Sequence, residues 1–246
     1  MTSDDEFRGT LGFARQGLRE VVVTTAIAGG AAAASAFVHP IAALPWIVPP
    51  LFSAWFFRDP TRHPPNDATA ILAPADGRLD DIREEPSCPF LDGPVVRLGI
   101  YLSLFDVHVN RAPFAAIGQR FEYRPGHRQP TWRVDKTDRN EQFVTWLRHE
   151  LPPHPVAVVR QIAGPAARRI CNWLRHGEHV AAGSRIGLIK FGSRTELFVP
   201  QSCGLRVVAR RGDRVRAGET VLARFDELAN TRAETASCAP RNGGFA

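Results

Sequence analysis

A long stretch without any charged side chain constrains the fold of this chain most strongly. From Val21 to Phe57 the sequence contains no Lys, Arg, Asp or Glu, and His39-Pro40 divides the stretch into apolar runs at 21–38 and 41–57. Charge-free stretches of this length are more typical of membrane-embedded helices than of a protein core. The stretch therefore predicts an N-terminal helical hairpin, with a buried hairpin in a globular body as the alternative.

The residues that flank this stretch predict its orientation. Arg15 and Arg19 precede it, and Arg58 and Arg62 follow it. Positive charge at both ends favours a hairpin whose two ends lie on the cytoplasmic side of the cell membrane. Prolines in the second run leave open whether the hairpin spans the bilayer or only enters it; they are Pro45, Pro49 and Pro50.

The remainder of the chain predicts a mainly β (α+β) protein. We expect residues 1–70 to form the hairpin and a Pro-rich linker, residues 71–230 a compact domain resembling a β-sandwich or barrel, and residues 231–246 a polar tail. Buried strands are expected at 95–103 and 156–164, and a strand, a turn and a second strand over 71–82. The best helical pattern after the hairpin is 167–177, with Gly177 as its C-cap.

An internal repeat supports the β assignment. Residues 177–191 match residues 212–225 at an offset that aligns Gly177 with Gly212 and Gly183 with Gly218. Each copy predicts a turn, a short strand, a glycine turn and a longer strand. The repeat therefore predicts two related hairpin units in the domain, a pattern that biotinyl and lipoyl carrier domains also contain.

The composition of the chain indicates which binding partners and which cellular compartment to expect. The formal net charge of +6 and the pI near 9.8 suit an anionic membrane surface. Nucleic acid is disfavoured because the sequence lacks zinc-finger spacing and aromatic-basic RNA-binding motifs. The four cysteines are expected to be reduced thiols in the cytoplasm, because none forms a C-x-x-C pair and no cleavable signal peptide is evident; they are Cys88, Cys171, Cys203 and Cys238. No metal site is predicted.

Polar side chains at the end of one predicted strand are candidates for catalysis. Asp106, His108 and Asn110 alternate with valines, so on a strand they would share one face. His108 could act as a general base or acid. Asp76, in the turn Pro-Ala-Asp-Gly, could orient a histidine, although Asp-Gly is also an ordinary turn pair.

The pair Gly192-Ser193 interrupts an apolar strand pattern within IKFGSRTELFVP (189–200). A β-bulge is the simplest explanation. Ser193 could also be a nucleophile, and with His108 and Asp76 it would form a hydrolase-like set. A serine hydrolase is disfavoured because the sequence contains no G-x-S-x-G elbow.

Seven segments in a fixed order resemble one known family. They are FFRDPTRHPP, ILAPADGRL, IYLSLFDVHVNRAP, YRPG, NE, IAGPAARRI and RIGLIKFGSRTELFVP. Together they resemble the phosphatidylserine decarboxylase proenzymes of the short bacterial type, over about residues 20 to 225. Individually each motif has moderate specificity, and the seven together are a strong indication.

This resemblance implies a self-processing, pyruvoyl-dependent enzyme. The chain would cut its own bond between Gly192 and Ser193, and Ser193 would become a covalent pyruvoyl group at the start of a small C-terminal chain. The large and small chains would stay associated and decarboxylate phosphatidylserine in the membrane to phosphatidylethanolamine and CO2. Ser193, His108 and Asp76 would be the catalytic residues, and a homo-oligomer is left open.

One departure from the family pattern bears on these roles. Longer relatives carry a second histidine where this chain has Arg111, so His108 would serve self-cleavage, decarboxylation or both.

The alternative function is a membrane-tethered carrier domain of the biotinyl or lipoyl type. It would need a modifiable lysine at a hairpin tip, and the only lysines are Lys136 and Lys190, the latter in the middle of a predicted strand.

Overall fold

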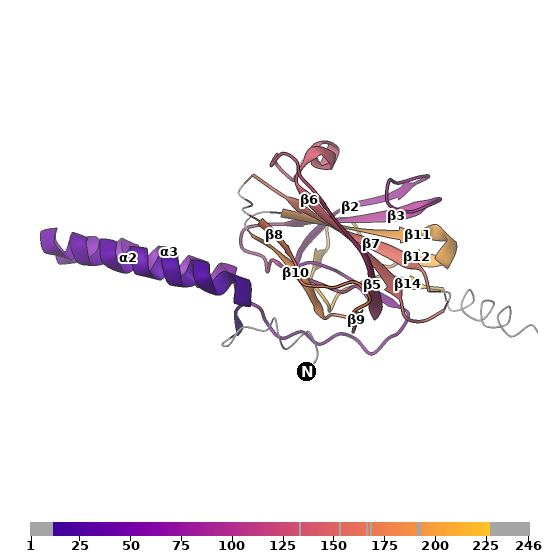
Figure 1. Ribbon diagram of the computed structural model, residues 1–246, viewed down its shortest axis with the longest axis horizontal. Coiled ribbons are helices and arrows are strands. Elements are labelled where there is room, and N and C mark those ends of the chain that lie inside the picture. Colours follow the sequence, from indigo (N-terminus) through magenta and orange to yellow (C-terminus); the bar gives the residue numbers. More distant parts are fainter. Residues whose placement is uncertain are drawn as a thin grey trace, which may run out of the picture.

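A helical hairpin projects from one side of a β-rich body in the computed structural model (Figure 1). The structure describes residues 12–132, 134–152, 154–165, 167, 169–190 and 193–226. After the short 3-10 helix η2 (Arg15–Gly17), the hairpin consists of α2 (Leu18–Val38), η3 (Pro40–Ile47) and α3 (Val48–Phe56). The predicted helical hairpin and the mainly β class are confirmed, whereas the predicted tail 231–246 lies outside the described residues.

The hairpin packs against itself and otherwise exposes its apolar side chains. Trp46 Nε1 donates to Ser35 Oγ at 3.0 Å, and Ser53 Oγ donates to Thr24 Oγ1 at 3.2 Å. Phe37 at the far end of α2 is 93% exposed. The 21 residues of α2 rise over roughly 31 Å, which matches the hydrocarbon thickness of a bilayer. By length and composition α2 could cross a membrane, and its exposure distinguishes it from the core helix of a soluble protein.

The base of the hairpin is fixed to the body by a small apolar cluster. Phe56 and Phe57 pack there with Val107, Val109 and Leu188. The backbone of Ala14 donates to the Phe57 carbonyl at 2.9 Å, and Lys190 Nζ donates to the Gln16 carbonyl at 2.9 Å. The hairpin is thus attached to the body at one defined place.

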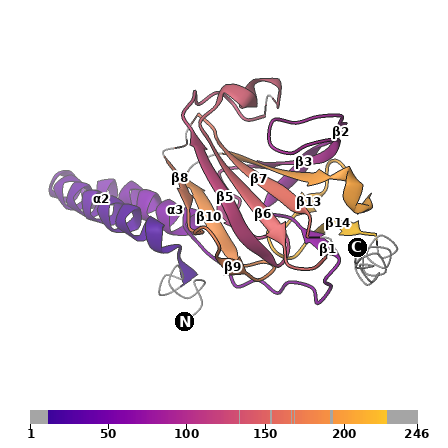
Figure 2. The same ribbon diagram turned by 45° about the vertical axis from the view of Figure 1, so that its right-hand side comes forward.

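The body contains one large sheet and two small ones. The eight-stranded antiparallel sheet has the order β13-β2-β3-β11-β7-β6-β5-β9 and curls around the core (Figure 2). Its strands are β13 (Arg214–Val215), β2 (Gly77–Glu85), β3 (Val95–Leu102), β11 (Ser193–Pro200), β7 (Val156–Ala163), β6 (Gln142–His149), β5 (Ala116–Arg124) and β9 (His179–Val180). The predicted strands at 95–103 and 156–164 are confirmed as β3 and β7.

The two small sheets have three strands each and are also antiparallel. One has the order β1-β14-β12, with β1 (Ala70–Leu72), β14 (Val221–Phe225) and β12 (Leu205–Val207). The other has the order β4-β10-β8, with β4 (Val109–Arg111), β10 (Arg185–Lys190) and β8 (Arg169–Asn172). The 3-10 helices η4 (Val134–Arg139) and η5 (Gln201–Cys203) lie in connections.

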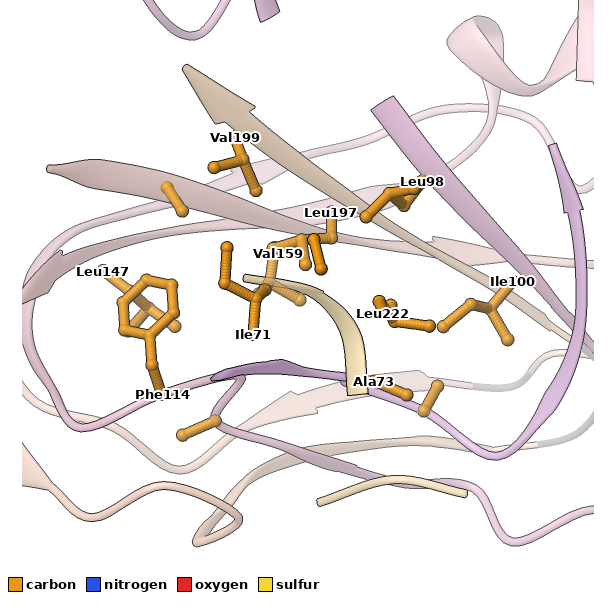
Figure 3. Packing of buried hydrophobic residues seen from close by; sticks show 14 of the residues in the cluster. Ile71, Ala73, Leu98, Ile100, Phe114, Leu147, Val159, Leu197, Val199 and Leu222 are labelled. Carbon is orange, nitrogen blue, oxygen red and sulfur yellow. The ribbon is translucent and has the colours of Figure 1, made fainter. Parts of the chain in front are cut away.

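The main core lies between the curled sheet and the sheet of β1, β14 and β12. Leu98 and Leu197 of the large sheet point toward Ile71 and Leu222 of the small one (Figure 3). All four are fully buried. Burial of a leucine or isoleucine side chain contributes roughly 1.5–3 kcal/mol, so this cluster accounts for much of the stability of the body.

The helix predicted over 167–177 is wrong. Arg169–Asn172 form β8, which pairs with β10 so that Cys171 lies opposite Leu188 and Ile170 opposite Ile189. Ile170 and Trp173 are buried, and Gly177 occupies a turn with φ of 78° before β9. Pairing with a buried neighbouring strand outweighs the local helical pattern of this segment.

The predicted repeat is confirmed as two units of a short strand, a glycine turn and a longer strand, which meet at their glycines. The prediction that each unit is a hairpin is wrong, because its two strands lie in different sheets and pair with other strands. The first unit holds β9 and β10, and the second holds β13 and β14. Gly183 and Gly218 adopt φ of 76° and 74°. A Cβ on Gly218 would lie 3.0 Å from the Cα of Gly183, so close approach as well as positive φ requires glycine there.

Candidate active site

Ser193 lies at one end of a central strand of the large sheet. It is the first residue of β11 and lies opposite Leu102 of β3 on one side and Ala163 of β7 on the other. Its side chain is fully buried, and Ser193 Oγ has no hydrogen-bond partner among the described residues. A buried hydroxyl without a partner is unusual and requires an explanation, and a catalytic role is one such explanation. Gly192, the other half of the predicted cleavage site, lies outside the described residues.

The predicted strand face of Asp106, His108 and Asn110 is only partly correct. The chain turns over 103–106 after β3, and only Asn110 lies in a strand, β4. The Asp106 carboxylate accepts hydrogen bonds from the Ser103 backbone and hydroxyl at 2.8 and 2.7 Å. This side chain to backbone bond closes a turn, which is why alternation did not continue through Asp106.

His108 is a buried, neutral imidazole with one nitrogen available. Its Nδ1 lies 2.9 Å from the Asp106 carbonyl, so Nδ1 carries the proton and Nε2 is the basic atom. Nε2 is buried and has no hydrogen-bond partner in the described structure. Burial lowers the pKa of His108 to about 4. The ring packs against Phe56 of the hairpin, with the ring centres 4.2 Å apart.

Backbone and side-chain contacts bring the His108 and Ser193 segments together. The Ile189 backbone donates to the His108 carbonyl at 3.2 Å, four residues before Ser193. Asn110, two residues after His108, accepts at Oδ1 from Gln161 at 2.6 Å and from Thr195 at 3.4 Å. Thr195 shares a face of β11 with Ser193 because side chains alternate along a strand. No hydrogen bond joins His108 to Ser193 within the part of the chain that is described.

Asp76 lies in the turn before β2 and bonds to groups other than His108. One carboxylate oxygen accepts from Arg62 at 2.7 Å, and the other accepts from the Ala217 backbone at 2.8 Å. Burial raises the pKa of Asp76, and the charge of Arg62 opposes that shift. The described structure therefore connects Asp76 to the linker, while the Asp106 carbonyl holds the His108 ring.

Arg111 connects the linker after the hairpin to the body of the protein. Its guanidinium donates to the Gly183 carbonyl at 2.9 Å, to the Asp59 carboxylate at 2.8 Å and to the Pro60 carbonyl at 3.0 Å. Asp59 also pairs with Arg185 of β10. This buried arrangement attaches the linker after the hairpin to the sheet that carries Asn110.

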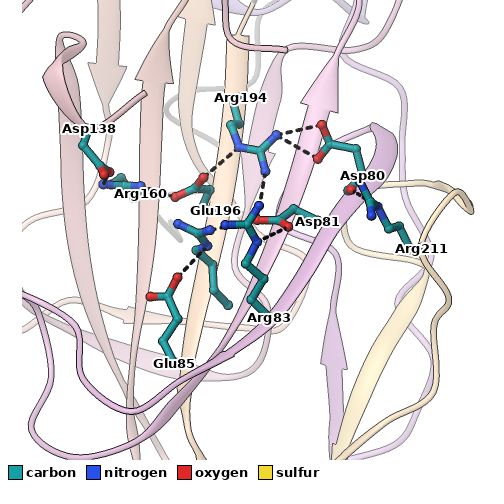
Figure 4. A network of polar contacts seen from close by, with 10 residues as sticks. Asp80, Asp81, Arg83, Glu85, Asp138, Arg160, Arg194, Glu196 and Arg211 are labelled. Carbon is teal, nitrogen blue, oxygen red and sulfur yellow. Dashed lines mark hydrogen bonds and ion pairs between the residues drawn. The ribbon is translucent and has the colours of Figure 1, made fainter. Parts of the chain in front are cut away.

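A buried ionic network on the opposite face of β11 was missed by sequence reasoning. Arg194 and Glu196 are fully buried, and Arg194 Nε donates to Glu196 at 2.7 Å (Figure 4). Arg194 also donates to both oxygens of Asp80 at 2.7 and 2.8 Å, and Glu196 accepts two bonds from Arg160. A Cβ at Gly99 of β3 would overlap the Arg194 guanidinium. Charged residues at alternate positions of an apolar strand were the available signal.

The described residues offer no cluster of His, Cys, Asp or Glu that could hold a metal ion. Lys190, which a carrier domain would need at a hairpin tip, lies at the end of β10 and is mostly buried. Its Nζ donates to Glu20 at 2.5 Å and to the Gln16 carbonyl. Cys88, Cys171 and Cys203 form no disulfide with one another, and Cys238 lies outside the described residues.

Comparisons with known proteins agree with this arrangement. The family model for phosphatidylserine decarboxylase matches residues 50–223. A phosphatidylserine decarboxylase proenzyme of Salinibacter ruber is 45% identical over 187 residues, covering 75% of this chain and 81% of that protein. The proenzyme of the same name from Rhodopirellula baltica is 37% identical over 227 residues, covering 92% of this chain and 94% of that protein.

The matched segment contains both strands that flank β11 and all the candidate catalytic residues. Fold, site and matches together place the molecule among the carboxy-lyases. The chain belongs to the phosphatidylserine decarboxylase family.

Proposed function

We propose that this chain decarboxylates phosphatidylserine to phosphatidylethanolamine and CO2 after cutting its own bond between Gly192 and Ser193. The observation that carries the proposal is the buried hydroxyl of Ser193 at the start of β11, which has no hydrogen-bond partner among the described residues and lies inside the segment that the family model matches. The proenzyme names of the relatives support maturation by cleavage. Residues 71–230 would form the catalytic domain.

Self-cleavage begins when Ser193 Oγ attacks the carbonyl carbon of Gly192. The Ser193 nitrogen leaves that carbon and keeps the proton delivered to it, so an ester replaces the peptide bond. Loss of the Ser193 α-proton then breaks the Cβ–O bond, which releases the upstream chain as a carboxylate and leaves dehydroalanine. Water hydrolyses the tautomer of this group to pyruvoyl and ammonia. Gly192 suits the step because a residue without Cβ gives the hydroxyl access to its carbonyl.

His108 supplies the base for this sequence. Its Nε2 is deprotonated at neutral pH because burial holds the pKa at about 4. The Asp106 carbonyl fixes the tautomer through Nδ1, in the way that an orienting carboxylate does in a hydrolase triad. Asp76 contributes to the site indirectly, through its charge. It pairs with Arg62 and lies near Arg58, and the positive charge of Arg58 disfavours protonation of His108.

The site also fits the pyruvoyl group that Ser193 would yield. Position 193 is fully buried, and His108 Nε2 and Asn110 Nδ2, which have no hydrogen-bond partner in the described part of the chain, offer an acceptor and a donor. When present, the group supplies a carbonyl that bonds the substrate amine and takes up the electrons left by CO2. His108 would hold the proton that the α-carbon receives.

The hairpin would attach the enzyme to the membrane that contains its substrate. Residues 21–57 lack charge, and α2 is exposed over most of its length. The flanking arginines favour a cytoplasmic location for both ends of the hairpin. Contact between Phe56 and His108 puts the base of the hairpin beside the candidate active site.

Mass spectrometry of the purified protein tests the cleavage. A small chain of 54 residues is expected, about 6 kDa in proportion to the 27.1 kDa of the whole chain, and it should lack a free N-terminal amine. Ser193→Ala should remain a single full-length chain without activity. An intact chain in an active preparation would overturn the proposal.

A further inference from the structure

A small apolar rim lies beside the base of the hairpin. It consists of Trp55 and Arg58 at the end of the hairpin and of Leu104 and Phe105 in the turn between β3 and β4. Trp55 is 54% exposed, Leu104 40% and Phe105 69%. Exposed aromatic side chains that gather next to a charge-free hairpin need an explanation, because single exposed apolar residues are ordinary but clusters mark contact surfaces.

Arg58 joins the two parts of this rim. Its guanidinium lies 4.2 Å from the centre of the Trp55 ring. It donates to the Trp55 carbonyl at 2.7 Å and to the Phe105 carbonyl at 2.6 Å. The 103–106 turn is therefore held against the end of the hairpin by a cation, and the two exposed aromatic residues belong to one surface.

The chemistry of the rim matches the interface of a lipid bilayer. Tryptophan and arginine are enriched where a membrane segment meets the head groups, because one end of each side chain is apolar and the other is polar. The exposed Arg214 side chain lies 3.9 Å from Asp106 and adds a second positive charge beside the turn. The rim is continuous with the hairpin, so a bilayer that holds the hairpin reaches the rim as well.

The same turn connects the two halves of the candidate active site. It begins directly after Leu102, which lies opposite Ser193, and it ends two residues before His108. We propose that the rim of Trp55, Arg58, Leu104 and Phe105 rests in the anionic lipid interface and brings a lipid head group to the buried site behind the turn. This inference rests on the proposed membrane attachment and function, which it deepens by naming the surface that receives the substrate.

A fluorescent label tests the lipid contact without any measurement of turnover. Phe105→Cys is made in a chain whose four native cysteines are alanine, and the new thiol is labelled with an environment-sensitive nitrobenzoxadiazole group. Ser87→Cys is the control, because Ser87 is exposed in the β2–β3 connection, at the opposite end of β3 from the turn. The eight residues of β3 separate the two sites by roughly 24 Å.

Each labelled protein is reconstituted in vesicles of phosphatidylethanolamine with a minority of phosphatidylglycerol, with and without nitroxide-bearing lipid. The label at position 105 should be several-fold brighter than the label at position 87, and nitroxide lipid should quench it. Equal brightness at the two positions would overturn the proposal. A label at position 105 that is bright but is not quenched by nitroxide lipid would also overturn the proposal, because another protein copy and not lipid would then cover the rim.

Photochemical cross-linking repeats the test without cysteine replacement. Phe105→benzoylphenylalanine in the otherwise unchanged chain should add the mass of a phospholipid after irradiation in the same vesicles, and a cross-link to protein alone would contradict the proposal.

A separate activity measurement tests the delivery of substrate. Phe105→Ser should raise KM for phosphatidylserine in vesicles several-fold while kcat and self-cleavage stay unchanged. Lipid contact without decarboxylation would refute the proposed function and leave the contact surface intact.

Discussion

Glu196→Gln is expected to destabilise the body more than any ordinary surface change. The Glu196 carboxylate is fully buried and accepts hydrogen bonds from Arg160 and Arg194. Glutamine keeps the size of the side chain but leaves two buried guanidinium groups without their shared negative charge. Removing one partner of a buried ion pair costs about 3–5 kcal/mol. At roughly 2–4 °C per kcal/mol for a chain of this size, Tm should fall by about 6–20 °C.

A matched exposed carboxylate gives the control. Glu122 also pairs with two arginines, Arg120 at 2.8 Å and Arg124 at 2.5 Å, but the Arg120 side chain is 66% exposed. Water screens such pairs, so Glu122→Gln should cost less than about 1 kcal/mol. Thermal unfolding of both variants, followed by circular dichroism in the same detergent at neutral pH, measures the difference. Equal Tm values for the two variants would refute the reasoning about the network.

The pH dependence of the same comparison checks the cause. Burial alone would raise the pKa of Glu196, but the charges of Arg160 and Arg194 outweigh burial and hold it below its ordinary value. A lowered folded-state pKa contributes stability that is present above the unfolded value, about 4.3, and is lost as pH falls through the folded value. The Tm advantage of the native chain over Glu196→Gln should therefore be full at neutral pH and shrink in acid.

The remaining predictions concern the candidate site and the hairpin. His108→Gln should slow self-cleavage by ~10²–10⁴-fold, the usual contribution of a positioned base, as measured by a time course on denaturing gels. Because burial lowers the pKa of His108 to about 4, native cleavage should keep its rate down to about pH 5 and slow only below that; a decline that begins at about pH 6.5 would contradict this assignment. Asp76→Asn should slow cleavage less than His108→Gln does, because Asp76 bonds to Arg62 and the Ala217 amide; equal slowing would show that Asp76 acts directly on the imidazole. The charge-free residues 21–57 should keep the chain in the membrane fraction through a high-salt wash, which screens surface charge, and release by salt would refute membrane insertion.

Local patterns predicted the elements whose environment is uniform along their length. β3 and β7 are buried at nearly every position, so their apolar runs were visible without knowledge of the fold. The glycines of the repeat were equally informative, because positive φ is a local requirement. The hairpin was predictable because exclusion of charge is a property of composition.

Prediction failed in segments whose structure depends on contacts with other parts of the fold. Residues 169–172 became β8 because β10 offers them a buried partner, which no local helical preference reveals. The turn at Asp106 depends on a hydrogen bond from the Ser103 backbone to the Asp106 side chain. In the sequence, this segment shows only the alternation of polar and apolar residues that is typical of a strand. Sequence reasoning did not single out Arg194 and Glu196, because only the fold shows that β11 has buried charge on one face and apolar core on the other.

The position of β11 determines the order in which this molecule could mature. Ser193 and the strand it begins are paired with β3 over eight register positions and with β7 over six. Strands beyond the proposed cut are also interleaved with strands before it, since β13 lies beside β2 and β14 lies between β1 and β12. A chain cut before folding would have to assemble this interior from two pieces. Folding must therefore come first, and the severed fragment would then stay in place upon dilution because its strands are paired with strands of the larger chain.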